Sequence, residues 1–197
     1  MAQGKQAKVL TEAQVRAVLN HVAESRYPER DRVMVLLSLK AGLRAKEIAG
    51  LSWGMVTDAE GSLGDVINLT NTASKGKTGG RTIPLNQELR AALAALKTAR
   101  GDKARADLPV IHSERAPGYS ANAVAHWFGA VYADLGFSGA SSHSGRRTFI
   151  TKAAKAIVGV GGSLRDVQQL AGHASLATTQ RYIEGDTDAK RKLMAII

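Results

Sequence analysis

The chain has 197 residues, of which 44% are hydrophobic, so it can bury a core, and its length suits one domain or two small ones. It carries 27 Lys and Arg against 17 Asp and Glu, and this net charge of +10 favours a polyanionic partner such as nucleic acid or an anionic membrane. The absence of cysteine excludes a disulfide framework, a thiolate metal site and a cysteine nucleophile.

The first part of the chain is predicted to be helical. Thr11 followed by Gln14 is a capping-box pattern, and it predicts a helix start. The apolar stripe of that helix follows at helical spacing, at Val15, Val18, Leu19 and Val22. Pro28 opens a second helix that ends at Gly42, and a short helix is expected from about Ala45 to Leu51.

Helical periodicity fades over residues 53–84. Val66 to Thr70 is typical of a strand, and Arg81 to Pro84 is predicted to be the returning strand, stopped by its proline. Between them, Ser74 to Gly80 is a glycine-rich turn that carries two lysines. The sequence therefore predicts a small antiparallel sheet with a basic turn.

The remainder is predicted to be helical apart from a charged connector at Gly101 to Gly118. The expected helices run from Asn86 to about Arg100, from Ser120 to about Leu135, from His143 to near Val158, from Ser163 to Leu170, and from about Thr187 to the end. A break is expected at Gly159 to Gly162. The predicted fold class is α+β, mostly helical with one small sheet inserted early.

Six polar residues spread over the chain are candidates for a catalytic site: Arg44, Lys75, His143, Arg146, His173 and Tyr182. Arginines, histidines and a lysine can hold a phosphodiester, and a tyrosine oxygen can attack it. Taken singly, each has an ordinary structural explanation, such as a solvated charge, a helix cap or a core tyrosine. Only the complete set points to DNA cleavage through a covalent protein–phosphate bond.

Local spacing supports part of this set. His143 and Arg146 lie three residues apart on a predicted helix and therefore share one face. Glu47 is a nearby carboxylate that can support Arg44. A lysine can donate a proton to a leaving oxygen, which makes the turn lysines, Lys75 and Lys77, candidate general acids.

Four motifs carry a resemblance to a known family: Ala-Gly-Leu-Arg-x-x-Glu-Ile at 41–48, His-x-x-Arg at 143–146, Leu-x-Gly-His at 170–173 and Thr-Thr-x-x-Tyr at 178–182. On these motifs the chain resembles the tyrosine recombinases, or phage-type integrases, over the family's catalytic domain from about Val9 to the final helix. The resemblance implies roles for seven residues: Arg44, His143, Arg146 and His173 bind the scissile phosphate, Glu47 supports the first arginine, Tyr182 is the nucleophile, and a lysine of the hairpin is the general acid. Of the two turn lysines we favour Lys75, which ends the incoming strand. Lys77 would then contact a phosphate.

The resemblance also implies a site-specific DNA recombinase that works through a 3′-phosphotyrosine intermediate. Because arginines and histidines supply the positive charge, we expect no metal and no other cofactor, and none of the five histidines shows ligand spacing. The expected partner is double-stranded DNA, bound as a homotetramer on two duplexes with residues 187–197 docking in trans. A monomer in isolation is the alternative state, and DNA-bending accessory proteins are candidate partners.

Further basic residues are predicted to position the DNA backbone: Lys77, Arg81, Arg147, Lys152 and Arg181. Because only residues 1–8 precede the first helix, we expect a single catalytic domain over 1–197, with a flexible start and without a core-binding domain before it. The polar start and the shortness of the most apolar run, Val33 to Leu39, predict a soluble protein without a membrane partner. We expect it in the cytoplasm with the nucleoid of a bacterium, encoded there or on a phage or mobile element.

Two other functions remain open on the sequence. A type IB topoisomerase shares this chemistry but relaxes supercoils without a partner duplex. A non-catalytic DNA-binding accessory module could keep the fold without the reaction.

Overall fold

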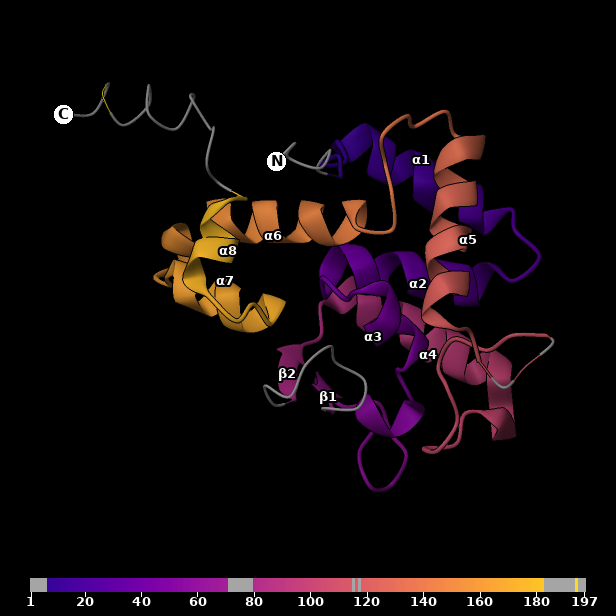
Figure 1. The fold of residues 1–197 in the computed structure, drawn as a ribbon. Helices are drawn as coiled ribbons and strands as arrows, with labels where there is room; N and C mark the ends of the chain where they lie inside the picture. Colours follow the sequence, from indigo (N-terminus) through magenta and orange to yellow (C-terminus); the bar gives the residue numbers. More distant parts are fainter. Residues whose placement is uncertain (1–6, 71–79, 115, 117, 183–193, 195–197) are drawn as a thin grey trace.

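The computed structural model describes residues 7–70, 80–114, 116, 118–182 and 194 (Figure 1). Its α-helices are α1 (Glu12–Ala23), α2 (Pro28–Lys40), α3 (Ala45–Ala49), α4 (Gln87–Arg100), α5 (Ala121–Asp134), α6 (Ser144–Ala156), α7 (Leu164–Ala171) and α8 (Leu176–Gln180). Short 3-10 helices are η1 (Trp53–Met55), η2 (Gly101–Lys103) and η3 (Ile157–Val160). The strands are β1 (Val66–Leu69) and β2 (Arg81–Pro84), which confirms the predicted mostly helical α+β class.

The helix starts follow the sequence signals closely. Thr11 caps α1 through its hydroxyl, which accepts from the Gln14 backbone, while the Gln14 side chain accepts from the Thr11 backbone. Pro28 is the first residue of α2, where its missing N–H costs nothing. The predicted short helix at 45–51 ends two residues early, because Gly50 is its C-cap.

Helix α2 is the central element of the main core. Most of its residues are buried, including the unbroken run from Val33 to Leu39. Helices α1, α4 and α6 pack against it, and Figure 1 shows α2 enclosed between them. The apolar run from Val33 to Leu39 thus belongs to a buried core helix. No helix in the described ranges is long and apolar enough to cross a bilayer.

Helix α6 packs against α2, and two glycines leave room for the contact. A Cβ at Gly145 would lie 2.3 Å from the Ser38 hydroxyl oxygen, and one at Gly42 would lie 2.4 Å from Cδ1 of Phe149. Gly42 also has a φ of 63°, in the left-handed region. This contact brings the start of α6 to the end of α2, and so brings Arg146 near Arg44.

The two strands form the predicted antiparallel pair, with Ile67 opposite Ile83 and Leu69 opposite Arg81. Ile67, Ile83 and Leu69 point into the main core, which anchors the sheet. Residues 71–79 lie outside the described residues, so the predicted turn and its lysines are not placed.

The last described helices form a second, smaller apolar cluster. Ile150 and Ala154 of α6 pack on Val167 and Ala171 of α7, and Tyr182 packs at the edge of this cluster. The break expected from Gly159 begins later, at Gly161, because η3 continues the helical path of α6. Apart from Met194, the expected final helix from Thr187 lies outside the described residues.

Candidate active site

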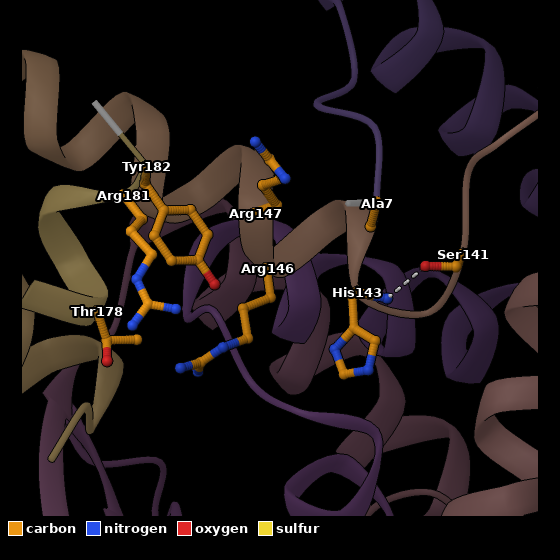
Figure 2. Close-up of a pocket in the computed structure, with 8 residues that line it drawn as sticks. All are labelled: Ala7, Ser141, His143, Arg146, Arg147, Thr178, Arg181 and Tyr182. Carbon is orange, nitrogen blue, oxygen red and sulfur yellow. Dashed lines mark hydrogen bonds between the residues drawn. The ribbon is translucent and has the colours of Figure 1, made fainter. Parts of the chain in front are cut away.

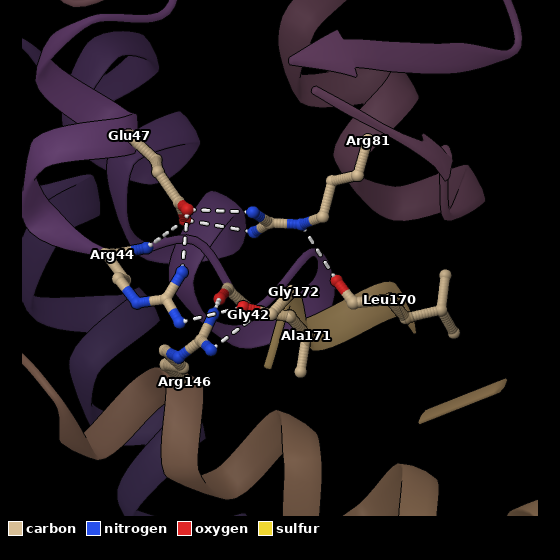
Figure 3. Close-up of polar contacts among 8 residues, drawn as sticks. All are labelled: Gly42, Arg44, Glu47, Arg81, Arg146, Leu170, Ala171 and Gly172. Atoms are coloured by element: carbon tan, nitrogen blue, oxygen red, sulfur yellow. Dashed lines mark hydrogen bonds and ion pairs between the residues drawn. The ribbon is translucent and has the colours of Figure 1, made fainter. Parts of the chain in front are cut away.

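One buried carboxylate, that of Glu47, organises two arginines (Figure 3). Glu47 is the third residue of α3, and its side chain reaches back to accept from the Arg44 backbone N–H at 2.8 Å and from Arg44 Nη1 at 2.9 Å. Its other contacts come from Arg81 of β2, with Nη1–Oε1 at 2.8 Å and Nη2–Oε2 at 3.0 Å. The Glu47 side chain is fully buried. Burial raises its pKa, but the hydrogen bonds and charges of Arg81 and Arg44 outweigh burial and leave the pKa below its usual value.

Arg146 lies beside this network and is itself buried, with 4% of its surface exposed. Its Nη1 donates to the Gly42 carbonyl at 2.5 Å and its Nη2 to the Ala171 carbonyl at 2.7 Å. Arg44 Nη2 donates to the neighbouring carbonyl of Gly172 at 3.2 Å, so both guanidiniums meet at the end of α7. Burial, and then the charge of Arg44, lower the pKa of Arg146 to about 10, and the side chain is therefore still cationic at neutral pH.

His143, Arg146 and Tyr182 line one open pocket of about 320 Å³ (Figure 2). His143 is the N-cap residue of α6, three residues before Arg146, and both residues line this pocket. Tyr182 follows α8, and Figure 2 shows its hydroxyl directed toward the face of α6 that carries Arg146. The rest of the lining comes from Ala7, Ser141, Arg147, Thr178 and Arg181.

His173 lies beneath the Tyr182 ring. The two rings stack with centroids 5.5 Å apart and an interplanar angle of 21°. Gly172 adopts a left-handed conformation as the C-cap of α7, and Gln168 exchanges two hydrogen bonds with the His173 backbone. These contacts hold the backbone of His173 in place, and so limit the positions that its ring can take.

From the sequence we expect the histidines to share in the positive charge of the site, but the structure places His173 where its charged form is disfavoured. Burial, and then the charges of Arg146, Arg44 and Arg81, lower the pKa of His173 to about 4. His173 is therefore neutral at neutral pH, and the arginines supply the positive charge of this site. Sequence spacing cannot show this, because the charges that depress the pKa come from distant segments.

Five of the six predicted catalytic residues are thus brought together by the fold: Arg44, His143, Arg146, His173 and Tyr182. The sixth, Lys75, and the other turn lysine, Lys77, lie outside the described residues, and their roles stay predictions. Within the described ranges no three His, Asp or Glu side chains are grouped to hold a metal ion.

Arg81, one of the predicted DNA contacts, is largely enclosed by protein groups in this structure. Its side chain is only 12% exposed, both of its terminal nitrogens bind Glu47, and its Nε donates to the Leu170 carbonyl at 3.0 Å. The guanidinium is committed to protein acceptors because β2 packs against α7. In the protein without DNA, Arg81 therefore links the sheet to the end of α7, and its contact with DNA stays a prediction.

The other predicted DNA contacts lie at or near the surface. Arg147 and Arg181 both line the pocket, and the Arg147 guanidinium lies 5.7 Å from the centre of the Tyr182 ring. Lys152 forms an ion pair with Glu12 and is half exposed.

One residue that the sequence reading did not single out is Thr179. It is fully buried, and its hydroxyl oxygen lies 2.9 Å from Nδ1 of His173. The sequence could have pointed to Thr179 only through its position in the motif Thr-Thr-x-x-Tyr. The motif does not show which side chain Thr179 contacts.

The fold assembled here is that of the catalytic domain of tyrosine recombinases. It is similar to the Tn1549 transposon integrase (residues 82–397) in complex with a circular intermediate DNA, with a TM-score of 0.75 and 22% identity, covering 100% of this chain and 68% of that one. It is also similar to XerA recombinase, with a TM-score of 0.73 and 23% identity over 98% of this chain and 66% of the other.

Sequence relatives agree with this assignment. Tyrosine recombinase XerD of Rickettsia conorii is 29% identical over 98% of this chain and 64% of its own length. Tyrosine recombinase XerC of Pelobacter propionicus is 31% identical over 84% of this chain and 51% of its own length. The profile of the phage integrase family matches residues 8–188, and the chain belongs to this family. It spans between about half and two thirds of the length of these relatives.

Proposed function

We propose that this chain is a tyrosine-type, site-specific DNA recombinase that cuts and rejoins DNA strands through a 3′-phosphotyrosine intermediate. The observation that carries the proposal is one pocket lined by both Tyr182 and Arg146. Membership of the phage integrase family and the names of the relatives support it.

The arginines are suited to hold the scissile phosphate. Each guanidinium has five N–H donors, and the contacts of Arg44 and Arg146 to Glu47 and to backbone carbonyls use only some of them. The remaining donors can bind phosphate oxygens while the existing bonds keep the planes of the guanidiniums in place. Charges held this way in a partly buried site stabilise a phosphorane-like transition state without reorganisation.

The proposed cleavage step needs these groups, a proton donor for the leaving oxygen and solvent to accept the phenol proton. Tyr182 gives its proton to solvent, and its oxygen bonds to phosphorus as the bond from phosphorus to the 5′ oxygen breaks. The hairpin lysine, which we assign to Lys75, protonates the departing oxygen. Attack by a 5′-hydroxyl of another strand reverses the step, and the energy of the phosphodiester is kept in the intermediate. ATP and a metal ion are therefore not required in this scheme.

The proposed partner is double-stranded DNA. Solved neighbours named as bound to DNA include the Tn1549 integrase and a lambda integrase dimer bound to a COC′ core site. The net charge of +10 and the pocket arginines suit the same partner. The proposal also includes a tetramer on two duplexes, with residues 187–197 docking in trans. It further includes one catalytic domain over residues 1–197 and a cytoplasmic location.

A covalent-capture experiment tests the function without knowledge of the target sequence. The protein is incubated with a degenerate duplex library in which each molecule carries one nick, and adducts that survive denaturation are isolated and their DNA sequenced. We expect an adduct that Tyr182→Phe abolishes while DNA binding persists. Tyr119→Phe, which removes a phenol oxygen outside the pocket, is the matched control and should keep the adduct.

The selected sequence then separates the remaining functions. A recombinase joins the cleaved strand to a second duplex, whereas a topoisomerase relaxes a supercoiled plasmid and leaves no recombinant. No adduct with any library member, despite DNA binding, would indicate a non-catalytic module and overturn the proposal.

A further inference from the structure

The contact between Thr179 and His173 raises the question of which group donates. Thr179 is 0% exposed and His173 is 9% exposed, so neither side chain has free access to water. Their atoms Oγ1 and Nδ1 lie 2.9 Å apart, within hydrogen-bond distance. A hydroxyl can donate or accept, and a neutral imidazole has one nitrogen of each kind, so geometry alone allows both directions.

Comparison with the hydroxyls of two other threonines indicates the direction of this hydrogen bond. The hydroxyls of Thr57 and Thr148 each donate to the carbonyl four residues earlier, at 3.0 and 2.8 Å. Thr179 makes no such bond to Ser175, and within the described residues the only hydrogen-bond partner of its hydroxyl is Nδ1 of His173. Because a buried hydroxyl proton usually has an acceptor, this favours donation from the Thr179 hydroxyl to Nδ1, since the opposite direction would leave that proton without an acceptor among the described residues.

The charges around the ring agree with this direction. The His173 ring stacks on the ring of Tyr182, and the positive charges of Arg146, Arg44 and Arg81 act on it. Three cations and a buried setting disfavour an imidazolium. A neutral ring that accepts at Nδ1 must carry its single proton at Nε2.

We propose that Thr179 is a positioning residue that selects the Nε2–H tautomer of His173, so that the neutral ring presents a hydrogen-bond donor to the phosphate. The inference rests on the proposed function for its consequence, but the tautomer is a property of the protein without DNA. Among the described residues Nε2 has no hydrogen-bond partner, which leaves it available for a ligand. With the opposite tautomer, Nε2 would be an acceptor and would repel a phosphate oxygen.

Nitrogen-15 spectra of the imidazole groups test the tautomer directly. At pH 7.5 and without DNA, the His173 signals, assigned by their loss in His173→Gln, should show a protonated Nε2 and an unprotonated Nδ1. Thr179→Val keeps the shape but removes the donor, and we expect Nδ1 to become protonated in a large fraction of molecules. Thr179→Ser should restore the wild-type pattern. A protonated Nδ1 in the wild-type protein, or no change in Thr179→Val, would overturn the proposal.

The rate of covalent adduct formation on the captured DNA tests the consequence. Loss of one hydrogen bond to a charged group predicts that Thr179→Val forms the adduct about 10- to 100-fold more slowly at saturating DNA, with little change in the dissociation constant. Thr179→Ser should react at nearly the wild-type rate, and Thr57→Val controls for loss of a threonine hydroxyl elsewhere. A changed tautomer with an unchanged rate would refute the positioning role. If the wild-type protein forms no adduct, the proposed function fails, while the spectra still decide the tautomer.

Discussion

Arg81 and Glu47, 34 residues apart in the chain, form two parallel hydrogen bonds of 2.8 and 3.0 Å in the protein interior. The same carboxylate binds Arg44, so one buried anion holds two guanidiniums (Figure 3). Because Arg81 also binds the Leu170 carbonyl, this pair links the sheet to the segment that positions His173.

Replacing Glu47 by Gln should destabilise the protein strongly. The substitution leaves two cations near one another without their shared anion, and removal of one partner of a buried ion pair costs about 3–5 kcal/mol. The free energy of unfolding from urea titrations measures the loss. Asp107→Asn, which removes a carboxylate from an exposed pair with Arg105, is the control and should have little effect. Equal losses in both variants would contradict a special role for the buried network.

Arg81 and Arg181 should respond differently in DNA-binding experiments. Arg181 is exposed and lines the pocket, so Arg181→Gln should reduce the slope of log affinity against log salt by about one. Arg81→Gln should leave that slope unchanged and lower stability instead, because its guanidinium binds protein groups. The comparison uses the captured DNA at several salt concentrations. A slope reduced equally in both variants would return Arg81 to the set of DNA contacts.

Stability should fall as the pH is lowered from about 6.5 toward 4. Burial, together with nearby cations, lowers the pKa values of both His112 and His173 to about 4 in the folded protein. Below about pH 6.5 these histidines become protonated in the unfolded chain, whereas in the folded protein they stay neutral. Acid therefore favours the unfolded state. The stabilisation is fully present above the unfolded pKa and is lost across this window.

Urea midpoints at pH 7.5, 6 and 5 measure this effect. The double variant His112→Gln/His173→Gln should show a clearly flatter dependence over the same range. If the double variant keeps the full dependence, other groups are responsible and the assignment to these histidines is wrong.

Gly42→Ala should cost more than Gly136→Ala, although both glycines have positive φ values, 63° and 69°. A Cβ at Gly136 would meet nothing within 4 Å, so its cost is the left-handed backbone alone, about 1–2 kcal/mol. A Cβ at Gly42 would also press on Phe149, and such overpacking adds about 1–3 kcal/mol. Thermal and urea unfolding of the two variants measure the difference. Equal costs would show that the Phe149 ring moves aside freely.

Much of the fold could be predicted because its signals are local. The capping pair at Thr11 and Gln14, the proline that opens α2, and the glycine that ends α7 act within one or two helical turns. The strand pair followed from short β-prone runs on either side of a glycine-rich turn. The position of the helical break was less well predicted, because η3 continues α6 through Gly159.

The sequence by itself determined which chemical groups are present and in which order, from Arg44 to Tyr182, and the family pattern follows from that order. Tertiary structure decided how those groups behave. It paired the Arg81 guanidinium with Glu47, it lowered the pKa of His173 to about 4, and it paired His173 with Thr179. Hydrogen-bond partners, burial and electrostatic fields depend on distances between segments far apart in the chain, and these distances exist only after the helices have packed.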